Sequence, residues 1–132
     1  MIGILLITHG DLGKEFIKSS ELIIGKQQSV SALGLFHGDS IDEFNNTVKN
    51  NIVKMDEGQG VLVLVDIFGG SPSNVTFLNL KEIGDKVNFK CITGVNMPMF
   101  LEACMMRSML GIDELAEHCF ALSKEGIRKF TE

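Results

Sequence analysis

The sequence predicts a single α/β domain in which a parallel β-sheet is covered by helices on both faces. Two short segments, residues 2–8 and 61–65, are apolar almost throughout, which is typical of strands that are buried on both sides. Elsewhere, apolar residues recur every three or four positions, as they do along one face of a helix. The two patterns alternate along the chain, and this alternation favours a parallel sheet. A length of 132 residues fits one domain, residues 1–132, with one core.

The first half of the chain contains two strand–helix units. Residues 2–8 form the first strand, and a helix follows over residues 11–24, with one side marked by Leu12, Phe16 and Ile23. A weaker strand covers residues 29–36 and leads into a second helix that is capped by Asp39 or Ser40. The apolar residues of this second helix stand three or four positions apart: Ile41, Phe44, Val48, Ile52 and Met55.

The second half repeats the pattern and adds a helix. A strand at residues 61–65 precedes a helix in which Ser71 is the predicted N-cap and Pro72 the first helical residue. This helix runs to about Ile83. Then come a fourth strand, two helices and an ambiguous tail that suits a short edge strand, at residues 87–93, 97–105, 112–119 and 126–130. Right-handed crossovers favour a flavodoxin-like, doubly wound sheet with strand order 2-1-3-4.

Composition and charge exclude several functions. A net charge of −5 argues against nucleic acid as a partner, because such binding depends on neutralising phosphates with lysine and arginine. No apolar run approaches the ~20 residues of a membrane span, and the first run is too short for a secretion signal. We therefore expect a soluble, cytoplasmic protein. The three cysteines have no metal-type spacing and are expected to be free, buried thiols: Cys91, Cys104 and Cys119. We expect neither a metal nor a cofactor.

A histidine and an aspartate end the two strands that should lie at the centre of the sheet. His9 ends the first strand, and Asp66 follows the third. Open α/β sheets bind ligands beyond the carboxyl ends of their strands, where the strand order reverses, and here that point lies between strands 1 and 3. Because neighbouring strands lie about 4.8 Å apart, the two side chains should be within hydrogen-bond reach. Asp66 would then hold the Nδ1–H group of His9 and leave Nε2 as a nucleophile.

The residues around this pair predict a phosphate site. Gly10, Gly69 and Gly70 allow main-chain amides to approach a ligand closely, and two helices begin here, whose N-termini favour anions. The hydroxyl group of Ser71 adds a donor. A nucleophilic histidine, an orienting carboxylate and an anion cradle together indicate phosphoryl transfer through a phosphohistidine. Two residues after the fourth strand suit a docking face for a partner protein, Met97 and Met99.

Three motifs resemble the enzyme IIA domain of the mannose class of the phosphoenolpyruvate-dependent sugar phosphotransferase system (PTS). They are Ile-Thr-His-Gly at residues 7–10, Leu-Val-Asp-Ile-Phe-Gly-Gly-Ser-Pro at residues 64–72 and Gly-Val-Asn-Met-Pro-Met at residues 94–99. The motifs follow the order of the family, and the similarity covers essentially the whole chain. Each motif alone is modest, but the three together are specific.

The resemblance implies roles and partners. His9 would be phosphorylated on Nε2, Asp66 would hydrogen-bond Nδ1, and Ser71 with nearby amides would bind the phosphoryl oxygens. The donor would be phospho-HPr, and the acceptor would be a IIB protein or domain, which relays the group to the membrane components IIC and IID. The family fold is a homodimer that exchanges an antiparallel C-terminal strand, which suits residues 126–130.

The sequence departs from many relatives in two respects. Phe68 stands where many relatives carry tryptophan, so an aromatic docking contact remains but its N–H group is lost. Many relatives are fused to a IIB domain, so the chain is expected to be a free-standing IIA or an excised domain. The resemblance does not identify the sugar, because the membrane components select it.

Three other interpretations stay open. A strand that ends in His-Gly also occurs in small α/β chelatases that insert metals into tetrapyrroles, with His37 as the best second histidine here. A phosphatase or mutase needs arginines around the phosphate, and the first arginine of the chain is Arg107. A regulatory module would keep the fold without transfer. Outside the chelatase interpretation, His37 and His118 are expected to be surface or packing residues.

Overall fold

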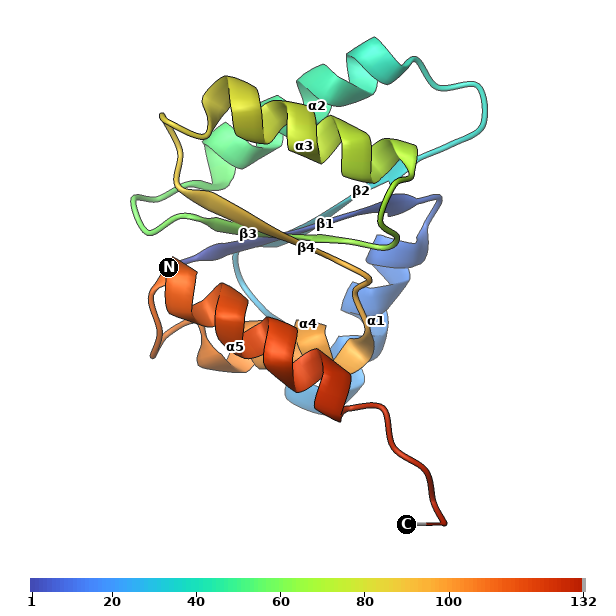
Figure 1. Ribbon diagram of the computed structural model, residues 1–132, viewed down its shortest axis with the longest axis vertical. Helices are drawn as coiled ribbons and strands as arrows, with labels where there is room; N and C mark the ends of the chain where they lie inside the picture. The colour runs from blue at the N-terminus through green and yellow to red at the C-terminus, as the bar shows by residue number, and fades with distance from the viewer. Residues whose placement is uncertain (132) are drawn as a thin grey trace.

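The computed structural model describes residues 1–131, in which four strands and five helices alternate until the last two helices (Figure 1). Their bounds are β1 (Gly3–His9), α1 (Leu12–Ile24), β2 (Val30–Leu35), α2 (Ile41–Met55), β3 (Val61–Val65), α3 (Ser71–Ile83), β4 (Phe89–Thr93), α4 (Met97–Met106) and α5 (Ile112–Glu125). The predicted alternation is therefore confirmed. No described helix has the length and apolar character that crossing a membrane would require.

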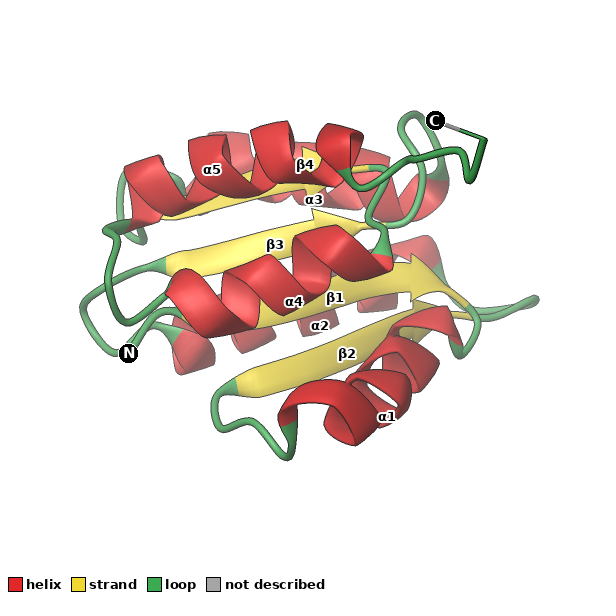
Figure 2. Ribbon diagram, turned by 90° about the horizontal axis from the view of Figure 1, so that it is seen from below, coloured by secondary structure: helices red, strands yellow, loops and turns green. Residues whose placement is uncertain are grey.

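The four strands form one parallel sheet in the predicted order β2-β1-β3-β4 (Figure 2). Helices α2 and α3 cover one face, and α1, α4 and α5 cover the other (Figure 1). Successive side chains of β1 point to opposite layers: Leu5 and Ile7 join the core under α2 and α3, whereas Ile4 and Leu6 join the other core. Strands β1 and β3 are thus packed on both faces, which fixes the positions of their neighbouring carboxyl ends.

Several predicted boundaries differ from those of the structure, and two of the differences have a clear physical cause. Gly70 has extended backbone angles (φ −79°, ψ 172°) and takes the N-cap position, so Ser71 is the first residue of α3 and Pro72 the second. Strand β4 begins at Phe89 rather than at residue 87, because the Val87 amide still donates to a carbonyl group at the end of α3. Neither difference changes the topology.

Strand β4 is one edge of the sheet, and within residues 1–131 it pairs only with β3. Residues 126–131 form no strand in the single chain, and after α5 they run away from the body of the protein (Figure 1). This tail carries two exposed apolar side chains, Ile127 and Phe130. An exchanged strand requires a second copy of the chain, so that part of the predicted fold stays a prediction.

All three cysteines are free thiols. Cys104 and Cys119 are buried in the layer of α4 and α5, and burial raises the pKa of these thiols to about 11 and about 12 respectively. Cys91 is exposed on β4, so the expectation of a buried thiol is wrong at this position. Phe89 and Ile92 of the same strand are buried, whereas Cys91 lines a groove along β4 in the single chain.

Candidate functional site

His9 and Asp66 meet at the carboxyl edge of the sheet. His9 is the last residue of β1, and Asp66 directly follows β3, the neighbouring strand. The Nδ1 atom of His9 lies 2.8 Å from Oδ2 of Asp66. The same oxygen accepts a hydrogen bond of 2.9 Å from the backbone amide of His9. One carboxylate oxygen therefore holds both the main chain and the ring of the histidine.

The second carboxylate oxygen fixes the aspartate itself. Oδ1 of Asp66 accepts a hydrogen bond of 2.9 Å from the amide of Ile67. The side chain of Asp66 is 11% exposed, whereas that of His9 is 51% exposed. A carboxylate next to Nδ1 favours the tautomer with the proton on Nδ1, so the lone pair lies on Nε2. The arrangement thus combines a half-exposed imidazole, whose Nε2 lone pair suits nucleophilic attack, with a sheltered carboxylate that orients the ring.

The turn after His9 is held by the first helix and by the other neighbouring strand. Gly10 has a φ of +57°, which favours glycine, and its amide donates to the carbonyl group of Leu35 in β2 at 2.8 Å. This amide is therefore not free for a phosphoryl oxygen, contrary to the predicted role of Gly10. On the other side, the buried hydroxyl of Thr8 accepts from the amide of Gly13 at 3.0 Å, which ties the strand end to α1.

Sequence reasoning missed Gly34, a residue of β2. A side chain at this position would place Cβ only 2.0 Å from the carbonyl oxygen of Gly10. Gly34 is therefore needed for the close approach of β2 to the turn that follows His9. No motif marks this glycine, because the contact depends on the register in which Thr8 pairs with Gly34.

The N-terminus of α3 lies beside the histidine ring. Gly69 has a φ of +87° and turns the chain, and Gly70 lies close to Cε1 and Nε2 of His9. No side chain caps α3, so the hydroxyl group of Ser71 does not have the capping role that was predicted for it. The first amides of a helix have no partner inside it, and the helix dipole favours an anion there. The structure therefore places Gly70 against the ring of His9, with Gly69 and Ser71 as its neighbours in the chain.

The three predicted docking residues differ in exposure. Phe68 is 82% exposed in the loop between Asp66 and Gly69, as a docking residue should be. Met97 is half-buried and lines a small hollow with Leu12 and Phe16 of α1. Met99 is only 2% exposed and belongs to the core under α4, so it cannot form part of a docking face.

The other two histidines do not have the surroundings of His9. His37 is exposed in the loop after β2. His118 is not a simple surface residue, since its Nε2 lies 2.7 Å from Oε2 of Glu102, between α5 and α4. Within residues 1–131 no three histidine, cysteine, aspartate or glutamate side chains form a group that could hold a metal ion.

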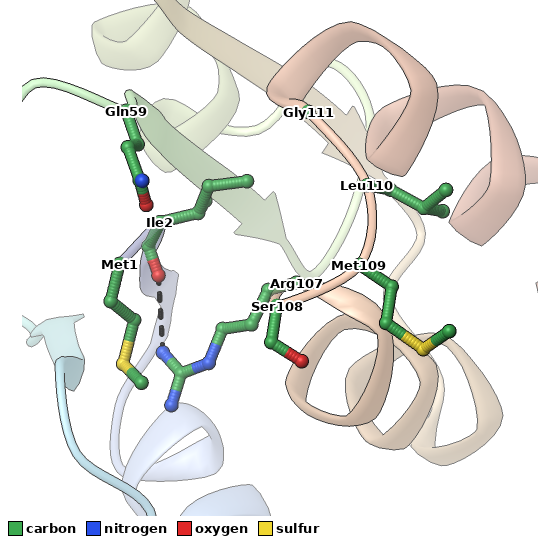
Figure 3. Close-up of a pocket in the computed structure, with 8 residues that line it drawn as sticks. All are labelled: Met1, Ile2, Gln59, Arg107, Ser108, Met109, Leu110 and Gly111. Atoms are coloured by element: carbon green, nitrogen blue, oxygen red, sulfur yellow. Dashed lines mark hydrogen bonds between the residues drawn. The ribbon is translucent and has the colours of Figure 1, made fainter.

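Arg107 lies at the opposite ends of the strands, where it lines a cavity of about 540 Å³ (Figure 3). It is buried and donates to the carbonyl groups of Ile2, Ser29 and Gln28, at 3.1, 3.2 and 2.5 Å. Ile2 precedes β1 and His9 ends it, which separates them by roughly 20 Å of extended chain. Arg107 therefore braces the amino ends of β1 and β2 and lies too far from His9 to hold a phosphate there, as a phosphatase or mutase would require.

Comparisons with known proteins identify the family. A family model described as "PTS system fructose IIA component" matches residues 3–120. The "PTS system mannose-specific EIIAB component" of Escherichia coli K12 is 31% identical over 128 residues, which is 96% of this chain but 39% of that protein. The chain thus spans about two fifths of the length of that relative. The "PTS system fructose-specific EIIA component" of Bacillus subtilis 168 is 29% identical over 132 residues, 100% of this chain and 88% of that protein.

A solved structure, the phosphotransferase system component EIIA from Streptococcus agalactiae, has a TM-score of 0.90 and 31% identity, and covers 99% of this chain and 98% of that chain. Fold and site together define an open, parallel α/β protein with a histidine–carboxylate pair at the topological switch point. The matched family model covers most of the chain, and the chain belongs to the IIA component family of the fructose and mannose phosphotransferase systems.

Proposed function

We propose that this protein is a phosphocarrier that accepts a phosphoryl group on Nε2 of His9 from phospho-HPr and passes it to a IIB protein or domain. The observation that carries the proposal is the 2.8 Å contact between Nδ1 of His9 and Asp66, on a ring that is half exposed. Membership of the IIA family supports the choice of donor and acceptor. The protein would act in the cytoplasm, and the IIB component would relay the group to the membrane components IIC and IID.

In the first transfer, the lone pair of Nε2 attacks the phosphorus atom of the donor. A bond forms between Nε2 and phosphorus, the bond between phosphorus and the donor breaks, and its electron pair leaves with the donor. The proton on Nδ1 stays in place, so the ring becomes cationic while the bond between Nε2 and phosphorus forms. Asp66 stabilises this positive charge through a charge-assisted hydrogen bond. The second transfer reverses these events toward the nucleophile of the IIB component.

The N-terminus of α3 would bind the phosphoryl oxygens. Gly70 lies against the ring of His9, and no side chain caps α3. The donors would then be the amides around Gly70 and the hydroxyl group of Ser71. Hydrogen bonds from such donors to a charged phosphoryl group are stronger than bonds between neutral groups. Phe68, exposed next to this cradle, would contact the partner proteins.

We further propose a homodimer in which the tail after α5 pairs antiparallel with β4 of a second copy. The edge of β4 lines a groove of about 450 Å³ that also contains Phe68, Ala116 and Phe120. An open edge strand is a template for pairing with another chain. Ile127 and Phe130, exposed on the tail, supply apolar side chains for that groove. Residues 1–132 would form one IIA domain in each copy.

Phosphorylation of a matched pair of variants tests the site. The purified protein is incubated with phosphoenolpyruvate, enzyme I and HPr, and the modified residue is located by mass spectrometry. His9→Ala should abolish the acid-labile phosphate. His118→Ala is the control, because His118 also touches a carboxylate at 2.7 Å but has no glycine loop beside it, and it should be labelled like the wild type. Labelling of His9→Ala would reject the site, and no labelling of the wild type would favour a regulatory module.

A further inference from the structure

Gly70 is a glycine whose backbone does not require glycine. Its φ of −79° and ψ of 172° are open to any residue, unlike the φ of +87° at Gly69. A side chain at Gly70 would instead meet the site. Its Cβ would lie 2.9 Å from Cε1 and 3.4 Å from Nε2 of His9, and 3.3 Å from Cγ2 of Ile67. Position 70 is therefore restricted by the histidine ring.

Gly70 also leaves α3 without a cap. Serine, threonine, aspartate and asparagine are preferred at N-cap positions because their side chains accept hydrogen bonds from the first amides of the helix. Two other helices use this device: Ser40 accepts from the third residue of α2 at 3.3 Å, and Asn96 accepts from the third residue of α4 at 3.0 Å. Helix α3 has no such bond, so no side chain occupies the amides at its start, which are those of Ser71 and Ser73 because Pro72 has none.

We propose that Gly70 is a positioning residue for phosphoryl transfer, and that α3 forgoes the stability of a capping side chain for this role. The missing side chain has two effects. It lets the ring of His9 stand against the loop with Nε2 unobstructed, and it keeps the N-terminal amides of α3 free for phosphoryl oxygens. This inference rests on the proposed function of His9.

The chain offers a matched control at Gly111. This glycine is the N-cap of α5, with a φ of −73° and a ψ of 170°, and α5 also lacks a side-chain cap. A Cβ at Gly111 would meet no atom within 4 Å. The same substitution at the two positions therefore has a comparable effect on backbone and capping, and differs in the contacts that Cβ makes at position 70 with His9 and Ile67.

The experiment compares alanine and serine at both positions, as Gly70→Ala, Gly70→Ser, Gly111→Ala and Gly111→Ser. Thermal unfolding reports the effect on the fold. The ¹⁵N chemical shifts of the His9 ring, measured by NMR on the unphosphorylated protein, report the position and tautomer of the ring. Single-turnover transfer from phospho-HPr, followed over a range of donor concentrations, separates the maximal transfer rate from donor binding.

We expect both serine variants to unfold at or above the melting temperature of their alanine counterparts, because serine can cap a helix. Gly70→Ala and Gly70→Ser should shift the ring resonances of His9 and lower the maximal rate by about 10- to 100-fold, since small displacements of reacting groups have effects of this size. The donor concentration at half-maximal rate should stay nearly constant. Both Gly111 variants should transfer at the wild-type rate.

Two results would overturn the inference. One is a maximal rate for Gly70→Ala within about twofold of that of Gly111→Ala. The other is a set of His9 ring resonances that Gly70→Ala leaves unchanged. A wild-type protein that accepts no phosphoryl group from phospho-HPr would instead refute the proposed function, and the NMR comparison would still decide whether Gly70 positions the ring.

Discussion

Replacing Asp66 with asparagine tests how the carboxylate acts, because the change is isosteric and removes one charge. Asp66 accepts three hydrogen bonds: two at Oδ2 from the amide and the ring of His9, and one at Oδ1 from the amide of Ile67. Asparagine has one acceptor oxygen and one NH₂ group. Whichever way the amide turns, its NH₂ group faces an N–H group that the carboxylate had accepted.

The size of the effect follows from these contacts. If the amide oxygen faces His9, a charge-assisted bond to a developing cation becomes a neutral bond, and the NH₂ group opposes the amide of Ile67. Bonds to charged groups contribute about 1.5–3 kcal/mol and neutral bonds about 1 kcal/mol. A loss of about 2 kcal/mol in the transition state slows transfer about thirtyfold. If the NH₂ group faces His9, Nδ1 must accept, the proton moves to Nε2, and the rate falls further.

The assay is the single-turnover rate of transfer from phospho-HPr to Asp66→Asn, with circular dichroism to show that the fold is intact. Asp56→Asn is the matched control. Oδ1 of Asp56 also accepts two hydrogen bonds, from the amides of Gly58 and Gly60 at 2.9 and 3.1 Å. This turn precedes β3, so it lies at the amino ends of the strands, away from His9. The control should transfer normally. A loss of less than about tenfold for Asp66→Asn, or ~1.4 kcal/mol, would refute the orienting role.

Three further predictions concern stability and assembly. Gly34→Ala should lower the free energy of unfolding, measured by urea denaturation, by about 1–3 kcal/mol. The loss should exceed that of Gly3→Ala, whose Cβ would lie 3.2 Å from a side chain. Equal losses for the two variants would contradict the close approach of β2 to the turn after His9. Burial raises the pKa of Cys104 from 9.0 to about 11 and that of Cys119 to about 12. The thiols of the unfolded chain therefore lose their protons at a lower pH than those of the folded protein, and the free energy of unfolding should fall as the pH rises above 9. This fall should be less steep in a variant with alanine at both positions. A chain that ends at Glu125 should sediment as a monomer and still be labelled on His9, whereas a persistent dimer would refute strand exchange.

The sequence was sufficient for the fold because its strongest patterns and its topology rules agree. The apolar runs that became β1 and β3 are completely buried, and they place His9 and Asp66 on neighbouring strands. The details that were missed depend on contacts between distant segments. Met99 follows a proline at the start of α4, where sequence alone does not show which side of the helix is buried.

The error at Ser71 has a similar cause. A serine before a proline is a good N-cap by local preference, but the loop from Asp66 to Gly70 reaches the helix one residue earlier. Gly34 could not be recognised because the chain contains 14 glycines, and only the pairing of β2 with β1 shows which of them faces the turn after His9.

The half-exposed ring of His9 limits how partner proteins could bind. If Nε2 carries the phosphoryl group as proposed, donor and acceptor would both have to reach that one nitrogen on a half-exposed ring. The two complexes would then be mutually exclusive, and each protein would have to dissociate before the other could bind. An excess of dephosphorylated donor would slow transfer to the acceptor by occupying the shared binding surface. Weak, short-lived complexes would therefore give faster phosphoryl transfer through the protein than tight ones.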